Sequence, residues 1–271
     1  MAGDPASACP WRARTRGVAG HGRAGGGGSL VVHAIVSDIH GNYEALETVL
    51  ADIAKHRPSS MVCLGDFVGY GASPNECIDR LRPMIEHAVA GNHDLAACGR
   101  LKLTYFNHNA ALAATWTETT LRPENLEYLR ALPFSVKWRE TLLVHASPAQ
   151  PEDWHYVLSP VEAEEEMAAY EEPVCFIGHS HYPGAFDRQG GHMRYTRAAE
   201  VRVEPGHRYL VNVGSVGQPR DGDPRAAYLL WDDETRILRH VRLEYDIAGA
   251  MKRIIDAGLP RFLAERLQWG E

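Results

Sequence analysis

Short apolar runs that end in polar residues recur along the chain and predict the strands of an α/β fold. The run from Val31 to Val36 has the length and β-branched content of a buried strand, and Asp38 and His40 follow it. Later runs repeat this order, an apolar stretch and then Gly, Asp, Asn or His, at residues 61–64, 87–90, 141–144 and 174–177. In open α/β sheets ligands bind beyond the carboxyl ends of the strands, so we expect the functional residues of this protein at those ends.

Helical patterns separate several of these strands. Asn42 can cap a helix whose apolar residues recur at helical spacing from Leu46 to Ile53, and Pro58 ends that helix. The segments Ser73 to Glu76 and Ser159 to Glu162 both have the Ser-x-x-Glu form of a capping box, so we expect a helix to begin at each. Strand, helix and strand in this order are typical of βαβ units with parallel strands.

The remaining chain combines a helical insertion with further strands. Residues 95–135 have helical spacing, and such an insertion could lie across the crevice as a cap. From Asp246 the chain is helical again, with a break at residues 258–260. Alternating patterns predict short strands at residues 185–187, 192–195 and 201–203, and the runs 209–213 and 226–231 extend the sheet.

Residues 1–29 differ from the rest of the sequence. They are rich in Gly, Ala and Arg and contain almost nothing that could pack, so we expect a disordered leader before one domain that covers residues 30–271. The glycines at positions 25–28 do not form a phosphate-binding loop, because no strand precedes them and no Lys-Ser/Thr follows them.

The amino-acid composition restricts the cellular compartment and the classes of binding partner that we expect. The 271 residues include 45% hydrophobic and 23% charged residues, as in soluble globular proteins. With 28 Lys and Arg against 35 Asp and Glu, the net charge is −7, which disfavours nucleic acid and anionic membranes as partners. A phosphorylated substrate would therefore need local positive charge, such as bound metal. The five cysteines are scattered and odd in number, which favours reduced thiols in a cytoplasmic protein.

The candidate chemistry lies at five strand ends. These ends supply oxygen and imidazole donors and no thiolate, from Asp38, His40, Asp66, Asn92, His145, His179 and His181. A single histidine after a strand is more often a structural residue, but seven such donors favour a metal site. They are too many for one tetrahedral ion and suit two divalent ions, manganese, iron or zinc, with Asp66 as the shared ligand.

These blocks, in this order, resemble the signature of the calcineurin-like metallophosphoesterases. The resemblance runs from about Ile35 to Trp231 and implies a four-layer α/β/β/α sandwich of two mixed sheets flanked by helices. It also implies that one metal binds Asp38, His40, Asp66 and His181, and that the other binds Asp66, Asn92, His145 and His179.

Two sequence features indicate a branch of this family. The segment Gly65 to Gly71 lacks the Asp-Arg-Gly of serine/threonine protein phosphatases, and the tail from Asn212 to Arg220 resembles small prokaryotic phosphodiesterases. Some members of that group cleave dinucleoside polyphosphates. We therefore expect hydrolysis of a phosphodiester or a nucleotide polyphosphate, a phosphorylated small molecule. A phosphomonoesterase or protein phosphatase, or an inactive binding module on the same fold, is the alternative.

Charge suggests the mechanism and the roles of nearby residues. Two cations lower the pKa of a water between them, and the resulting bridging hydroxide can attack phosphorus in line. We expect His93 to stabilise or protonate the leaving oxygen, and Asp94 to orient His93 unless it caps the following helix. Asn92 and Arg220 are expected to contact the phosphate, although Arg220 could equally lie on a solvated surface.

Aromatic residues of the helical insertion have two interpretations. They could stack on a nucleobase, as aromatic side chains do in nucleotide sites, but their helical spacing favours a place in the core. The residues are Tyr105, Phe106, His108, Asn109 and Trp116.

Overall fold

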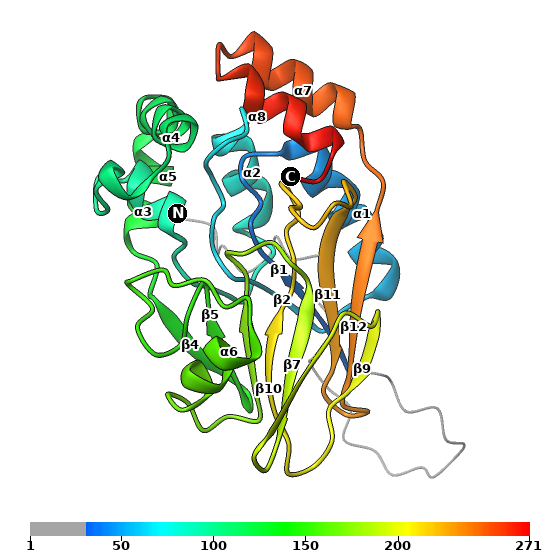
Figure 1. Cartoon of the computed structure of the whole chain (residues 1–271). Helices are drawn as coiled ribbons and strands as arrows, with labels where there is room; N and C mark the ends of the chain where they lie inside the picture. Colours follow the sequence, from blue (N-terminus) through cyan, green and yellow to red (C-terminus); the bar gives the residue numbers. More distant parts are fainter. Residues whose placement is uncertain (1–30) are drawn as a thin grey trace, which may run out of the picture.

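Two mixed six-stranded sheets form the centre of the computed structural model, which describes residues 31–271 (Figure 1). The predicted leader lies outside the described residues. The first sheet has the order β3 (His87–Ala88), β2 (Ser60–Cys63), β1 (Val32–Val36), β11 (Ala226–Asp232), β12 (Ile237–Leu243) and β9 (Glu200–Arg202). The second has the order β4 (Ser135–Trp138), β5 (Thr141–Val144), β6 (Val174–Ile177), β10 (Arg208–Asn212), β7 (Gly184–Gln189) and β8 (His192–Thr196).

Parallel pairing brings the expected strand ends together. β1, β2 and β3 are parallel neighbours, with Val36 opposite Cys63, and β5 and β6 are parallel neighbours in the other sheet. Helix α1 (Tyr43–His56) connects β1 to β2, and the Asn42 side chain caps it by accepting the Ala45 N–H at 3.1 Å. The crossover therefore places the segments after β1 and β2 at one edge of the first sheet.

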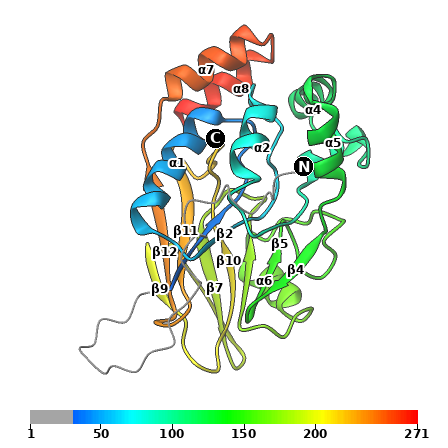
Figure 2. The ribbon, with the colours of Figure 1, turned by 180° about the vertical axis from the view of Figure 1, so that it is seen from behind.

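Three clusters of apolar side chains lie between the four layers and hold them together. Ile53 of α1 and Ile78 of α2 (Pro74–Leu81) pack on the outer face of the first sheet. Phe176 and Trp231 fill the space between the sheets, and Met167 of α6 (Pro160–Met167) covers the second sheet. Figure 2 shows α1 and α2 on the side away from α6. The expected α/β/β/α sandwich is confirmed.

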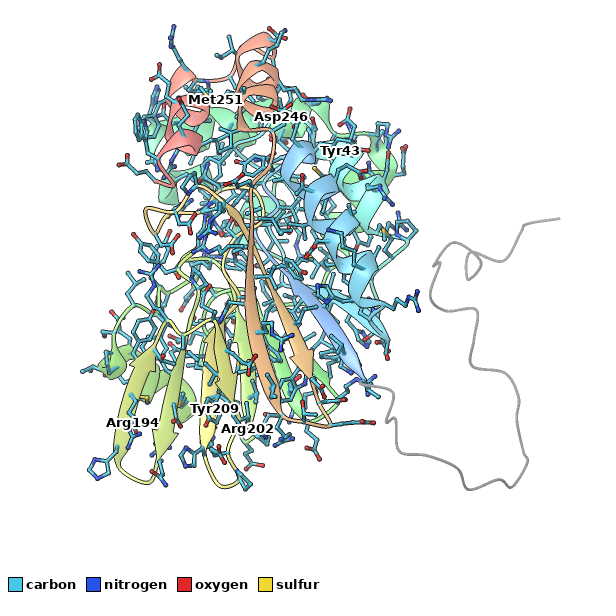
Figure 3. All side chains as sticks on the ribbon, turned by 90° about the vertical axis from the view of Figure 1, so that its right-hand side faces the viewer. Tyr43, Arg194, Arg202, Tyr209, Asp246 and Met251 are labelled. Carbon is cyan, nitrogen blue, oxygen red and sulfur yellow. The ribbon has the colours of Figure 1, made fainter. Side chains whose placement is uncertain are left out.

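Helices gather at the carboxyl ends of the parallel strands. Tyr70 packs with residues of α4 (His108–Thr120), α7 (Ile247–Asp256) and α8 (Arg261–Glu265). In Figure 3, Met251 lies at this end of the molecule and Arg194 at the opposite end. The insertion also contains α3 (Asn92–Ala97), a 3-10 turn (Leu103–Tyr105) and α5 (Pro123–Arg130), and a second 3-10 turn (Arg266–Gln268) follows α8. No described helix is long and apolar enough to cross a membrane.

The two predicted capping boxes have different outcomes. At α6, Ser159 and Glu162 exchange both capping hydrogen bonds, as predicted. At α2 the helix begins as predicted, with Ser73 as its N-cap and Pro74 as its first residue, but the Ser73 side chain makes no capping bond. The Ser73 N–H donates instead to the carbonyl of Gly41 at 3.0 Å, so it is not free for the exposed Glu76.

Candidate metal centre

Five strand ends converge on one buried cluster of polar side chains. β2 lies between β1 and β3, so Asp66 lies between the residues that follow its neighbours, as expected. The facing sheet contributes His145 after β5 and the pair His179 and His181 after β6. The structure therefore brings donors from both sheets together across the interior.

The distances within the cluster are short. Nε2 of His40 lies 3.1 Å from Nε2 of His181, which is 3.2 Å from Oδ1 of Asp38. Oδ2 of Asp66 lies 3.3 Å from Nε2 of His145 and 3.6 Å from Nε2 of His40. Three sets of donors have atoms within 4.8 Å of one another: Asp38, His40 and His181; His40, Asp66 and His93; and Asp66, His145 and His179.

Main-chain carbonyls orient each imidazole. Nδ1 of His40 bonds to the carbonyl of Val68 at 3.1 Å, and Nδ1 of His145 to that of Leu64 at 2.7 Å. His181 Nδ1 bonds to the carbonyl of Gln218, and Nε2 of His179 to that of Trp154 at 3.0 Å. One nitrogen of each ring is thus occupied and the other is free for the cluster, which is how protein metal sites fix their histidines.

The backbone is strained at the donor residues. Five of them have positive φ between 49° and 63°, a region that residues other than glycine rarely occupy. These residues are Asp38, His40, Asp66, His179 and His181. Left-handed backbone at so many converging side chains is typical of functional sites, where the surrounding fold maintains it at a cost of about 1–3 kcal/mol each.

Two glycines allow the carboxylates their positions. A Cβ at position 91 would lie 2.0 Å from Oδ1 of Asp66. A Cβ at position 178 would lie 2.4 Å from Oδ2 of Asp38 and 2.1 Å from Oγ of Ser37. Gly91 and Gly178 are therefore required by close approach, because any side chain would displace a candidate ligand.

The cluster is fully buried, and its groups perturb one another. Burial disfavours ionisation of Asp38 and Asp66, but neighbouring imidazoles outweigh it and lower the pKa of both carboxyls. Burial lowers the pKa of His179 to about 3. For His145 the carboxylate of Asp66 outweighs burial and raises the pKa to about 9. Two ionised carboxylates among imidazoles are a suitable environment for cations.

The donor set fits divalent metal ions. Oδ1 of Asn92 and Nε2 of His145 are buried and have no hydrogen-bond partner among residues 31–271. Such an atom costs about 1–3 kcal/mol unless something binds it. Because these atoms belong to two of the expected ligands and the other donors are oxygens and imidazole nitrogens, manganese, iron and zinc all match the chemistry of the site.

Asp94 does not pair with His93 and instead accepts hydrogen bonds from main-chain N–H groups. Its carboxylate accepts main-chain N–H groups of Asp66 at 2.8 Å, Gly91 at 3.1 Å and Val68 at 3.3 Å. Nδ1 of His93 has no partner among the described residues, so the predicted pairing of Asp94 with His93 is wrong. Gly91, not Asp94, is the N-cap of α3, but Asp94 at the third helical position accepts the Gly91 N–H and so does help to cap that helix. Asp94 holds the loop that carries Asp66.

A small cavity of about 80 Å³ opens onto the cluster. Asn92, His93 and Arg220 all line it. Burial lowers the pKa of His93 to about 4. Arg220 is partly buried and donates to Tyr70 Oη at 3.1 Å and to Gln218 Oε1 at 3.0 Å, so it does not lie on a solvated surface.

Other lining residues were not among the sequence candidates. Tyr70 and Tyr156 line the cavity, and the Tyr156 ring stacks on His179 at 4.2 Å. Of the aromatic residues in the insertion, Phe106 lines the cavity, whereas Trp116 packs in the apolar cluster around Tyr70. The glycine-rich loop after Asp66 could have indicated Tyr70, but no pattern marks Tyr156.

Comparison with known proteins agrees with this geometry. The sequence model of the calcineurin-like phosphoesterase superfamily domain matches residues 31–236. An uncharacterized protein of Methanocaldococcus jannaschii is 39% identical over 241 residues, which cover 88% of this chain and 97% of that protein. The crystal structure of a metallophosphoesterase from Sphaerobacter thermophilus is 37% identical, with a TM-score of 0.79, over 90% of this chain and 100% of that one.

A more distant structure shares the fold. A hypothetical protein of Pyrococcus horikoshii OT3 is 22% identical, with a TM-score of 0.73, over 89% of this chain and 98% of that one. The family match covers every strand of both sheets except β12, and every strand end that carries a candidate ligand. This chain therefore belongs to the calcineurin-like phosphoesterase superfamily.

Proposed function

We propose that the protein hydrolyses a phosphodiester or a nucleotide polyphosphate with the help of two divalent metal ions. The observation that carries this proposal is the convergence of seven oxygen and nitrogen donors from five strand ends in one buried cluster, beside a cavity that also contains Arg220. Family membership supports a hydrolase of phosphate esters.

The donors divide into two sets that share Asp66. Asp38, His40 and His181 would complete one set, and Asn92, His145 and His179 the other. When bound, two such ions supply a nucleophile from water at neutral pH and neutralise charge on the phosphoryl group. The main-chain contacts of the imidazoles keep the donors in place, so little reorganisation is needed on binding.

The protein's own side chains would bind and orient the phosphate. The Arg220 guanidinium is fixed by Tyr70 and Gln218 and can donate charge-assisted hydrogen bonds to phosphate oxygens. The Asn92 amide could donate to the same group. His93 lines the cavity, and its Nδ1 has no hydrogen-bond partner among the described residues. An anionic phosphate bound beside it would raise the pKa of His93 against the effect of burial, and the imidazolium would then donate a proton to the leaving oxygen.

Hydrolysis of bis-p-nitrophenyl phosphate with manganese tests the proposal. We expect turnover by the parent and a loss of about 10²-fold or more in kcat for His93→Ala, the range for general acid catalysis. His192→Ala is the matched control, because His192 is exposed on β8 and lines neither cavity beside the cluster. Absence of turnover by the parent with manganese, iron and zinc would support the inactive binding module instead.

A substrate panel then separates the ester classes. Relative kcat/KM values for diesters, monoesters, cyclic nucleotides and dinucleoside polyphosphates compare transition-state binding directly. We expect the diesters or polyphosphates to exceed the monoesters. The opposite order would favour the phosphomonoesterase alternative.

A further inference from the structure

A second, larger cavity adjoins the candidate metal centre. It encloses about 490 Å³, a volume typical of small-molecule sites, whereas the cavity over the cluster encloses only about 80 Å³. The two share Asn92, Phe106, Tyr156 and His179 in their linings. A phosphoryl group at the cluster could therefore extend its organic part directly into the larger cavity.

Aromatic rings dominate the wall between this cavity and the cluster. Each ring lies against a histidine of the site, which fixes its position. Tyr156 stacks on His179 with ring centres 4.2 Å apart and an interplanar angle of 20°. Phe106 meets His93 edge to face at 4.9 Å, and Trp154 lies 6.0 Å from His145. Such rings offer apolar faces for a planar group.

Charge distinguishes the two sides of the cluster. Glu152 and Asp153 line the larger cavity and form no ion pair within 4 Å with any described residue. Their carboxylates repel a further phosphate and can accept hydrogen bonds from hydroxyl or amino groups. The larger cavity therefore suits an uncharged group better than an anion.

The side of the cluster next to Tyr70 is positive. Arg220 and Arg266 both lie near Tyr70, with their Cζ atoms 5.5 and 6.0 Å from its ring centre. Within residues 31–271, no side-chain carboxylate forms an ion pair with either guanidinium. Arg266 donates to a main-chain oxygen of Glu271. Among the described residues Arg220 donates only to the uncharged side chains of Tyr70 and Gln218, so it is the less compensated of the two cations. Any additional phosphate would therefore be attracted to this side.

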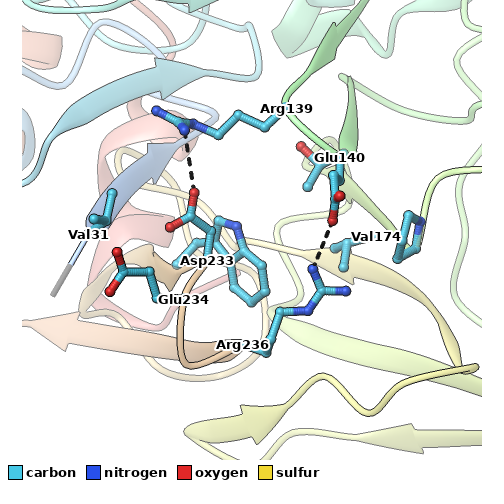
Figure 4. Close-up of a pocket in the computed structure, with 10 residues that line it drawn as sticks. Val31, Arg139, Glu140, Val174, Asp233, Glu234 and Arg236 are labelled. Carbon is cyan, nitrogen blue, oxygen red and sulfur yellow. Dashed lines mark hydrogen bonds and ion pairs between the residues drawn. The ribbon is translucent and has the colours of Figure 1, made fainter. Parts of the chain in front are cut away.

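A groove in another part of the structure contains arginines whose charges are paired with carboxylates. It lies at the amino ends of β5 and β6, away from the cluster (Figure 4). There Arg139 pairs with Asp233 at 3.4 Å, and Arg236 with Glu140 at 3.1 Å. These charges are balanced internally, and the groove provides no comparable anion site.

We propose that the larger cavity binds the organic part of the substrate, and that this part is a planar, uncharged aromatic group with hydrogen-bond donors, as in a nucleoside. Any additional phosphate points toward Arg220 and Arg266. The inference rests on the proposed function, because it assumes a phosphoryl group at the cluster. It adds a specificity subsite formed by Leu101, Phe106, Trp154 and Tyr156 with an acidic rim.

Two ligands that differ only in the base test the subsite. We choose the methylenephosphonate analogues of AMP and of ribose 5-phosphate, which resist hydrolysis, and titrate them calorimetrically into manganese-loaded protein. Stacking of one base corresponds to a preference of about 10- to 100-fold for the AMP analogue. Leu101→Trp adds volume inside the cavity, and it should reduce this preference to about 1, with binding of the ribose analogue as the measure of whether the phosphate site is intact. Leu112→Trp is the control, because Leu112 is 46% exposed on α4.

The outcomes distinguish failure of the proposed subsite from failure of the proposed function. Equal binding of the two analogues by the parent would overturn the subsite while leaving phosphate binding intact. A preference for the AMP analogue that survives Leu101→Trp would place the base elsewhere and would also overturn it. If neither analogue binds, the proposed function itself fails.

Discussion

Replacing Asp66 by asparagine should weaken metal binding more than any other single isosteric change. Oδ1 of Asp66 accepts the main-chain N–H of His93 at 2.8 Å, and an amide oxygen can keep that bond. Oδ2 faces His145 and His40 at 3.3 and 3.6 Å, so an amide nitrogen there removes the anionic donor from two donor sets at once. The fold should therefore survive while both metal sites are damaged.

The size of the effect follows from linkage. Loss of residues that only support a metal ligand reduces affinity by about 10- to 100-fold, so loss of a ligand should cost about 100-fold or more. At saturating metal a 100-fold loss removes about 2.7 kcal/mol of stabilisation for one site. For a domain of this size that corresponds to about 5–10 °C in Tm.

Thermal unfolding with and without manganese measures this effect without turnover. The parent should gain stability on addition of metal, and Asp66→Asn should lose about 5–10 °C of that gain together with activity toward every substrate. Asp256→Asn is the control, since Asp256 is exposed at the end of α7, lines neither cavity beside the cluster and is in no donor set. A metal-induced shift and a turnover equal to those of the parent would refute the bridging role of Asp66.

Three further predictions follow from other parts of the structure. Gly178→Ala places a Cβ 2.4 Å from Oδ2 of Asp38, so the purified variant should contain clearly less metal by elemental analysis, and a parental metal content would contradict this. The parent itself should approach two equivalents of metal per chain after supplementation, and far fewer would exclude a dinuclear site. Burial lowers the pKa of His240 to about 4, so its contribution to stability is present above pH about 6.5 and is lost as the pH falls toward 4. Denaturant titrations at pH 7 and pH 4 should therefore differ by up to about 3 kcal/mol more in the parent than in His240→Gln, and an equal pH dependence would argue against a neutral buried imidazole.

The fold was largely predictable because buried parallel strands leave a strong pattern. The strands at 141–144 and 174–177 have the predicted bounds, since all of their residues are buried and apolar or small. β12 was not predicted, because its sequence from Ile237 to Leu243 has no regular alternation of apolar and polar residues, and most of its residues are only partly buried. A half-exposed strand of this kind carries too weak a periodicity to be distinguished from a loop, although β12 lies between β11 and β9 in the sheet.

The candidate ligands were predictable for the same reason. Asp38 and Asp66 lie just beyond the parallel neighbours β1 and β2, so the parallel topology brings them to one edge of the first sheet, and the packing of the second sheet brings His179 after β6 to them. The partner of Asp94 was not predictable in this way. Its carboxylate could reach either the next side chain or the main-chain N–H groups of a neighbouring loop, and only the packing of the loop after β2 decides between them.

The surroundings of the cluster depend on contacts that no local pattern encodes. Tyr156 lies in an irregular segment before α6, yet its ring stacks on His179. Arg266 lies near the end of the described chain, and it comes close to Tyr70 only because the C-terminal helices pack on the glycine-rich loop after β2. Strand topology thus determines where the metal chemistry occurs, whereas loops and a C-terminal helix pair from distant parts of the sequence form the walls that a substrate meets. Relatives that keep all seven donors could therefore differ in substrate through these wall residues alone, and Leu101, Tyr156 and Arg266 are the positions at which we expect such differences to act.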